Sequence, residues 1–330
     1  MPSRGNLKPR LFMLSRPSTK ATLGKVSLFS SVMTAQPIEI DSNQLALLTM
    51  VHLLRHARFG AIVLVCVPMW AQQAHLLTIS AAPGTLVRWS APGTTHCTMK
   101  GRSWAALQGT CYYPVDLEQP TGAHISISRS GSGHSAVARI TVDAIDYGTE
   151  EITLPDIPQA NPSPADLKRD ARDRALLGKV WNRKEGPARF TLPLALPVQP
   201  LPKGKSFGVK RVFNGKPASQ PHTGTDYATP VGSPILAVAD GTVVVAEDLF
   251  FEGNAVFIDH GDGLISMYFH LAEIKVQAGD DVKKGHTLGR VGSTGRATGP
   301  HLFFGVRWHN ARINPQFVLE APSKIPNITP

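Results

Sequence analysis

The sequence predicts a mainly β protein with more than one domain. Its 330 residues exceed the roughly 100–200 residues at which a single core usually stops growing. The chain contains 29 Gly and 27 Pro residues, a composition that favours short strands separated by turns over long helices. No apolar run approaches the roughly 20 residues of a membrane-spanning helix, which excludes a polytopic membrane protein.

The net charge of +10 lies mostly near the N-terminus. Residues 1–74 carry eight Lys and Arg but only two acidic residues, which leaves +4 for residues 75–330. In the C-terminal half, Lys and Arg are scattered among Asp and Glu and lack interleaved aromatic residues. This pattern does not fit a nucleic-acid-binding face, so we predict no nucleic-acid partner.

Residues 50–74 have the layout of a secretory signal peptide. Arg55 and Arg58 precede an apolar stretch at 59–70, and Ala71 and Ala74 offer small residues for cleavage. Because this pattern starts at Met50, we predict that residues 1–49 are an over-extended gene start. The alternative is a disordered basic leader before an internal signal anchor. Either way we expect a periplasmic or extracellular protein whose membrane contact is limited to this segment.

Export changes the interpretation of the three cysteines. Cys66 lies in the signal segment, whereas Cys97 and Cys111 lie 14 positions apart in a turn-rich region. An oxidising compartment favours a disulfide between them, and two unpaired structural thiols are the alternative. Neither cysteine has the spacing of a metal site.

Residues 75–155 predict a small antiparallel β-sandwich-like domain. The runs LLTIS (76–80), TLVRW (85–89), HISIS (124–128) and ARITVDAI (138–145) are typical of strands, and APG, PTG and SGSG are typical of the turns between them. His96, His124 and His134 fit surface positions better than ligand positions. We interpret this region as a positioning domain or a pro-domain.

Residues 156–205 predict a Pro-rich connector with one helix. Ser163 is expected to be the N-cap and Pro164 the first helical residue. Leu167, Ala171 and Ala175 form a narrow apolar stripe, so the helix should pack weakly. A charge-rich face is expected to be solvated: Lys168, Arg169, Asp170, Arg172, Asp173 and Arg174.

Residues 206–320 predict a second, antiparallel β domain, followed by a tail at 321–330. Its expected strands are PILAVA (234–239), GTVVVAE (241–247), NAVFIDH (254–260), LISMYFHL (264–271) and TLGRVG (287–292). Helical periodicity is absent from this region. The glycine-rich stretch at 278–295 indicates tight hairpins that curve the sheet.

Four polar residues of this second domain predict a shared site. His222 and Asp226 lie four positions apart, and an extended segment places such residues on one side. His270 and His301 are embedded in apolar strands, where an imidazole without a partner costs several kcal/mol to desolvate. Catalytic zinc needs three nitrogen or oxygen ligands and an open position for water, so a metal site is one interpretation of this group.

These motifs resemble the lysostaphin/LytM-type zinc metallopeptidases, which cut peptide cross-links in bacterial cell walls. The resemblance covers residues 207–319. It includes SFG, PHTGTDYATPVGSPILAVADGTVV, YFHL, GDDVKKGHTLGRVGSTGRATGPHL and the closing INP, in that order. It implies a small antiparallel β-sheet with a groove over the metal, a zinc cofactor and peptidoglycan peptides as the substrate.

The resemblance also implies roles for individual residues. His222 and Asp226 match two of the three zinc-ligand positions of the family. His270 matches the histidine that stabilises the tetrahedral intermediate. His301 matches the first histidine of a His-x-His pair and would act as general base.

The second histidine of that pair, the third zinc ligand, is Phe303 in this chain. Alternate residues of a strand share a face, so Phe303 should point toward the site, where a phenyl ring offers a metal no lone pair. His260 or His309 would have to supply a substitute ligand, although both are more simply explained as turn histidines. Zinc binding is therefore expected to be weakened or absent unless another ligand compensates.

Two functions follow from this pattern. The first is an exported zinc endopeptidase that cleaves cell-wall cross-links. The second is a catalytically degenerate module of the same fold, which binds murein or activates a partner cell-wall hydrolase. A general carbohydrate-binding β domain was the third alternative, but it does not explain the spacing of His222 and Asp226.

Overall fold

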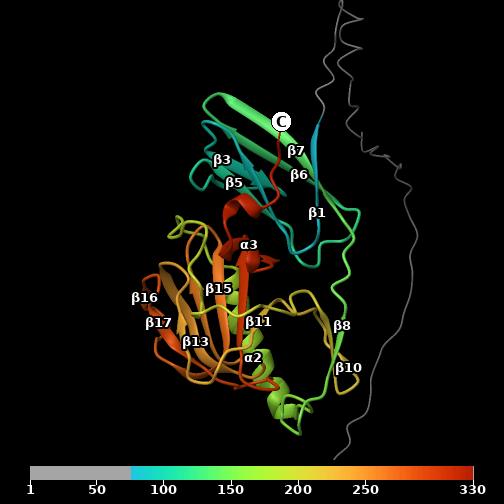
Figure 1. The fold of residues 1–330 in the computed structure, drawn as a ribbon, viewed down its shortest axis with the longest axis vertical. Coiled ribbons are helices and arrows are strands. Elements are labelled where there is room, and N and C mark those ends of the chain that lie inside the picture. Colours follow the sequence, from blue (N-terminus) through green and yellow to red (C-terminus); the bar gives the residue numbers. More distant parts are fainter. Residues whose placement is uncertain (1–75, 330) are drawn as a thin grey trace, which may run out of the picture. The chain divides into compact units, whose positions relative to one another are not determined.

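The computed structural model describes residues 76–329, and these residues form a mainly β structure with one long helix, as predicted (Figure 1). The signal segment and the leader, residues 1–74, lie outside the described residues. Within 76–329, no helix is both long enough and apolar enough to cross a membrane. The boundaries proposed above for the successive domains stay predictions.

Seven strands form the N-terminal part of the described residues. One sheet has five strands in the order β1-β7-β6-β3-β4, and β2 pairs with β5 separately. The bounds are β1 Leu77–Ala81, β2 Leu86–Ser90, β3 His96–Met99, β4 Arg102–Ala105, β5 Thr110–Pro114, β6 His124–Gly131 and β7 His134–Val142. The expectation of a purely antiparallel arrangement was wrong at one position, because β1 runs parallel to β7.

A shared apolar cluster holds these two sheets together. Along β6, Ile125 and Ile127 are buried while His124 and Ser126 are exposed, the alternation expected of a strand with one solvated face. Cys97 of β3 and Cys111 of β5 form the predicted disulfide, with Cα atoms 5.4 Å apart. The predicted surface histidines, His96, His124 and His134, are all exposed.

A three-stranded sheet joins segments that are distant in the sequence. It contains β8 Thr149–Ile152, β9 Lys210–Phe213 and β10 Lys216–Pro217, and β8 runs parallel to β9. In this register Glu150 lies opposite Arg211. This sheet was not expected from the sequence, and its strand β9 carries Arg211 to the candidate site.

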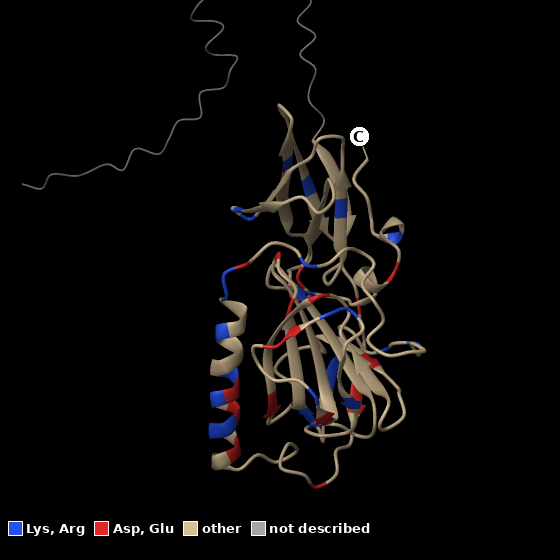
Figure 2. Ribbon diagram, turned by 90° about the vertical axis from the view of Figure 1, so that its left-hand side faces the viewer, with Lys and Arg blue, Asp and Glu red and all other residues tan. Residues whose placement is uncertain are grey.

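The helix α2, Pro164–Trp181, begins as predicted. The Ser163 hydroxyl accepts a hydrogen bond from the Asp166 amide, and the Asp166 carboxylate accepts one from the Ser163 amide. This reciprocal pair satisfies amide groups that have no partner within the helix. Charged residues of both signs follow one another along α2 (Figure 2).

The predicted packing of α2 was wrong. Leu167 is 51% exposed, whereas Asp170 and Asp173 are buried. The buried carboxylate of Asp173 is compensated by a hydrogen bond, because its Oδ2 atom accepts from the Phe250 amide at 2.8 Å. The apolar contact is instead made by Val180 near the end of the helix.

The C-terminal part is a nine-stranded antiparallel sheet with the central order β11-β18-β15-β14-β13-β16. Its strands are β11 Gly224–Tyr227, β12 Pro234–Leu236, β13 Gly241–Leu249, β14 Gly253–Asp259, β15 Leu264–Ile274, β16 Asp281–Val282, β17 Thr287–Val291, β18 Leu302–Trp308 and β19 Ala311–Ile313. One helical turn, α3 Gln316–Leu319, falls in a region where no helix was expected, and the 3-10 turn Pro322–Lys324 follows it.

The two faces of this sheet carry different apolar clusters. Phe304 and Trp308 of β18 belong to the main core, together with Tyr268 of β15. Phe303, one position away, belongs to the opposite face, where Val245, Phe257 and Met267 pack against Val180 of α2. The alternation of a strand thus directs Phe303 to the helix-covered face.

Candidate functional site

Asp226 and Phe303 lie directly opposite each other at one end of this helix-covered face. Strand β11 pairs with β18 so that Asp226 faces Phe303, and β15 pairs on the other side so that Phe269 also faces Phe303. Opposite residues of an antiparallel pair share a face. The carboxylate and the two phenyl rings therefore form one row across three strands.

Two imidazoles point their Nε2 atoms at Asp226. His222 Nε2 lies 3.4 Å and His301 Nε2 lies 3.6 Å from Asp226 Oδ1. Each ring is oriented through its other nitrogen, because His222 Nδ1 bonds the Ser206 carbonyl at 3.0 Å and His301 Nδ1 bonds the Gly299 carbonyl at 2.8 Å. A carbonyl only accepts, so Nδ1 carries the proton in both rings.

His270 reaches the same site through a bulge in β15. The register of β15 against β14 shifts beside it, and its φ of 67° lies in the left-handed region that residues other than glycine rarely adopt. Its Nδ1 atom donates to the Thr294 carbonyl at 2.8 Å, and its ring centroid lies 4.8 Å from that of His301. Burial, followed by the charge of His301, lowers the pKa of His270 to about 3.

Arg211, which the sequence analysis missed, binds the other oxygen of Asp226. Its Nη2 atom donates to Asp226 Oδ2 at 2.5 Å, while its Nε atom donates to Glu150 at 3.3 Å. Burial by itself would raise the pKa of Asp226, but the neighbouring His222, Arg211 and His301 hold it below its usual range. Asp226 is therefore a carboxylate anion that accepts a hydrogen bond from Arg211.

Phe303 fills the space next to this carboxylate. Its side chain is 4% exposed, and its ring stands edge-on to that of His222 with centroids 5.1 Å apart. It also lies so close to the main chain of β11 that a Cβ atom at Gly224 would be 2.4 Å from its ring. The ring therefore faces the candidate site and at the same time ends the apolar cluster beneath α2.

The side chains present do not make a complete zinc site. Among residues 76–329, no group of three or more His, Cys, Asp or Glu side chains is arranged to hold a metal ion. His222 and Asp226 supply two donors, Arg211 competes for the carboxylate, and a phenyl ring supplies no lone pair. Structural and catalytic zinc sites both need at least one more protein ligand than this pair provides.

The two histidines considered as substitute ligands bond elsewhere. His260 is completely buried, with Nδ1 bonded to the Asp240 carbonyl and Nε2 to the Ser266 hydroxyl. His309 bonds Glu185 through Nδ1, and its ring packs against Trp104 at 4.1 Å. Neither ring bonds a residue of the Asp226 group.

Residues 220–315 match the sequence profile of Peptidase family M23. The solved structures include a similar chain, an M23 peptidase from Pseudomonas aeruginosa. It is 30% identical, and the alignment covers 72% of the present chain and 94% of that one with a TM-score of 0.56. The chain belongs to peptidase family M23. This membership agrees with the resemblance seen in the sequence.

Curated peptidoglycan hydrolases also resemble part of this chain. Peptidoglycan DD-endopeptidase ShyC of Vibrio cholerae is 44% identical over 97 residues, which are 29% of this chain and 22% of that protein. DD-carboxypeptidase/endopeptidase Mpg of Neisseria meningitidis is 45% identical over 94 residues, 28% of this chain and 22% of that protein. The chain thus spans about a fifth of the length of these relatives.

The range of the M23 match, 220–315, includes the four predicted site residues and Phe303. The structure brings His222, Asp226, His270 and His301 together, and it places Phe303 in the same row as Asp226. The individual roles carried over from the resemblance stay predictions. Arg211 could not be found by the same reasoning, because it lies outside the motifs of the resemblance, in β9, whose sequence has no strong apolar pattern.

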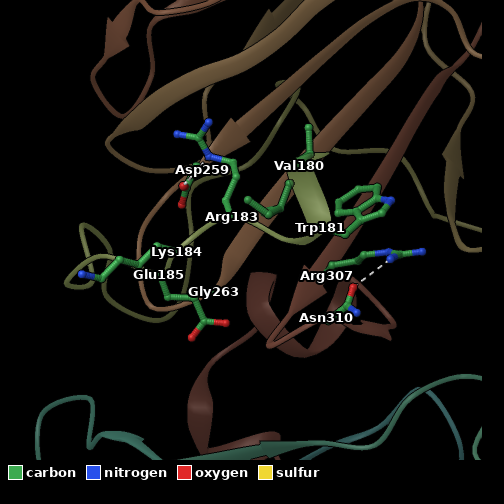
Figure 3. A pocket seen from close by; sticks show the side chains of 10 residues that line it. Val180, Trp181, Arg183, Lys184, Glu185, Asp259, Gly263, Arg307 and Asn310 are labelled. Carbon is green, nitrogen blue, oxygen red and sulfur yellow. Dashed lines mark hydrogen bonds and ion pairs between the residues drawn. The ribbon is translucent and has the colours of Figure 1, made fainter. Parts of the chain in front are cut away.

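Two surface pockets differ in volume. Figure 3 shows one beneath the end of α2, where Trp181 lies against Arg307 with the guanidinium carbon 4.1 Å from the ring centroid. Its volume is about 30 Å³, roughly the space of a single water molecule. A larger pocket of about 250 Å³ is lined by Asp226 and His301. Of these two, the second is large enough for part of a peptide.

Proposed function

We propose that this M23 protein binds the peptides of bacterial peptidoglycan in the pocket beside Asp226 and His301 and does not cleave them. The substrate class is inferred from the similar proteins, a peptidoglycan DD-endopeptidase and a DD-carboxypeptidase/endopeptidase. The absence of cleavage follows from one observation. Phe303, which the resemblance places at the position of the third zinc ligand, stands opposite Asp226.

Three structural features support a binding role for the remaining polar groups. Arg211 neutralises Asp226 with its own guanidinium, so the carboxylate is stable without a divalent cation. The phenyl stack of Phe303 on Phe269 closes the space below the imidazoles with apolar atoms. His301 remains 17% exposed at the pocket, where it can bond a peptide group.

A second candidate function is zinc endopeptidase activity, and one observation favours it. Asp226 Oδ1 is buried without a hydrogen-bond partner among the described residues and is approached by two imidazole Nε2 atoms. A metal held by these three groups would use His301 as a ligand, which removes it as the general base. Activity would then depend on a different general base, which the described residues do not place beside Asp226.

The experiment uses the full chain with purified peptidoglycan sacculi. Co-sedimentation measures binding, chromatography of the soluble fraction measures released peptides, and elemental analysis after equilibration with zinc measures metal content. We expect co-sedimentation, no released peptides and much less than one zinc per chain. Stoichiometric zinc with released peptides would establish the second candidate, and failure to co-sediment would overturn the binding proposal.

The site of action follows from this proposal. Peptidoglycan lies outside the cytoplasmic membrane, so the protein must be exported, consistent with the signal-like segment at 50–74. A degenerate M23 module could also act by activating a partner cell-wall hydrolase. Adding the protein to a peptidoglycan hydrolase that acts on the same sacculi, and measuring its rate of peptide release, tests this form of the proposal.

A further inference from the structure

The pocket beside Asp226 carries an excess of positive charge. It is lined by three cationic side chains, Lys205, Arg211 and Arg296, and by two carboxylates, Glu150 and Asp226. Arg211 bonds both of these carboxylates at once. The charges of Lys205 and Arg296 are therefore left without an acidic partner in the pocket wall.

Arg296 is held in place by aromatic rings. Its guanidinium carbon lies 4.1 Å from the ring centroid of Phe213 and 4.6 Å from that of Phe251, both within cation–π range. Its amide donates to the Phe251 carbonyl at 2.8 Å, which fixes the main chain at the same point. The guanidinium is thus positioned before any ligand arrives, which lowers the entropy lost on binding.

The N–H groups of Arg296 remain free within the described part of the chain. Its side chain forms no hydrogen bond or ion pair with residues 76–329, although it is partly buried. Glu252 and Asp170 are the acidic residues whose charges act on it, and neither comes within ion-pair distance. Asp170 is paired with Arg174, and burial raises the pKa of Glu252.

Lys205 supplies the second unpaired charge. Its main chain is fixed to β11, because its amide donates to the Asp226 carbonyl at 3.2 Å and its carbonyl accepts from the Asp226 amide at 3.0 Å. Its side chain is exposed and has no hydrogen-bond partner among the described residues. A cation of this kind adds attraction at longer range than a directional bond does.

We infer that this pocket recognises a free carboxylate group of the bound peptide, with Arg296 as the anchoring residue and Lys205 as a supporting cation. The planar guanidinium offers paired N–H donors in the geometry that a carboxylate accepts. The inference rests on the proposed function, since it names the group of the peptidoglycan peptide that this pocket selects.

The test compares two forms of one synthetic peptidoglycan stem peptide. In the first form all carboxyl groups are free, and in the second every carboxyl group is converted to a carboxamide of nearly the same shape. Dissociation constants for the full chain are measured by calorimetry at fixed ionic strength. We expect the free acid to bind about 10- to 100-fold more tightly, the range for hydrogen bonds to a charged group.

Variants of the two cationic residues test which side chain recognises the carboxylate. Arg296→Gln should remove most of the preference for the free acid, and Lys205→Gln should reduce it by a smaller factor. Arg139→Gln is the matched control, because this exposed arginine of β7 carries the same charge outside the pocket. If Arg296→Gln unfolds after losing its contacts with Phe213 and Phe251, Lys205→Gln still tests the inference at an exposed position.

The outcomes separate this inference from the proposed function. Equal binding of the two peptide forms, or an undiminished preference in both pocket variants, would overturn carboxylate recognition and leave peptide binding intact. An equal loss in Arg139→Gln would show general charge attraction and would also overturn it. If neither peptide nor sacculi bind, the proposed function itself fails.

Discussion

The ring of Phe303 lies parallel to that of Phe269, with centroids 4.3 Å apart and an interplanar angle of 2°. These rings project from neighbouring strands, β18 and β15, onto the face that α2 covers. The stack continues the apolar layer of Val180 and Met267 up to the imidazole of His222. In this chain, therefore, the position beside Asp226 contributes to the core.

Replacing Phe303 by His should supply the missing donor. We expect Phe303→His to raise zinc affinity by at least about 10- to 100-fold, since changes that merely orient a ligand already have effects of this size. Competition with a chelating zinc indicator measures the affinity. Without metal the variant should be less stable, by about 1–3 kcal/mol, because it loses the ring stack and buries a polar group.

Phe303→Leu is the control for this substitution. It removes the same ring contacts but adds no donor atom, so it should lower stability and leave zinc affinity unchanged. If the His and Leu variants bind zinc equally, position 303 is not a ligand position, and the argument for a lost metal site fails.

Local patterns in the sequence predicted much of this fold. Ser163 followed by Pro164 marked the start of α2, because capping and a fixed φ act within a few residues. The strand runs were found by their apolar alternation and their turns. The pairing of Cys97 with Cys111 followed from their separation and the expected compartment.

Contacts between distant segments were not predictable in the same way. Arg211 meets Asp226 because a main-chain hydrogen bond between Val209 and His222 folds the segment between them back on itself. Strand β9 carries no strong apolar pattern that would have revealed this. Arg296 is noticed only when Phe213 and Phe251, from two other segments, are seen beside it. Convergence of the four polar site residues was expected from their spacing and their apolar neighbours, and the resemblance to a family added a role for each.

Asp173 of α2 should matter more for stability than the exposed apolar residue of the same helix. Asp173→Ala leaves the buried Phe250 amide without its acceptor, and we expect a loss of about 1–3 kcal/mol. Leu167→Ala should change the free energy of unfolding by less than about 0.5 kcal/mol, since Leu167 is 51% exposed. Urea denaturation of both variants measures this difference. A larger loss of stability in Leu167→Ala than in Asp173→Ala would instead support the apolar packing of Leu167 that the sequence predicted.

The disulfide between Cys97 and Cys111 should stabilise the N-terminal sheets. It closes a loop with a sequence separation of 14, for which chain entropy predicts about 3 kcal/mol. The double variant Cys97→Ala and Cys111→Ala should lose about this amount in denaturation experiments. Reducing agent should destabilise the wild-type protein similarly but leave the variant unchanged. Equal sensitivity of both proteins to reductant would contradict the assignment.

Asp262 should make the folded protein less stable as the pH rises. Burial raises the pKa of this carboxyl from 3.8 to about 6, although the charge of nearby His309 acts in the opposite direction. The folded state therefore binds a proton more tightly than the unfolded chain does, and stability falls as the pH increases from about 4 to 6. Above this range the cost is on the order of 2–3 kcal/mol.

Asp262→Asn tests this dependence with little change in shape. The φ of Asp262 is 47°, a left-handed value that asparagine tolerates. The Trp308 indole donates to the main-chain carbonyl of residue 262, so this bond is kept.

We expect the variant to exceed the wild type in stability at pH 7–8 and to match it below about pH 4. Asp143→Asn, at an exposed carboxyl, is the control and should show no such pH-dependent gain. A constant difference between Asp262→Asn and wild type at every pH would mean that the burial of this carboxyl is not the cause.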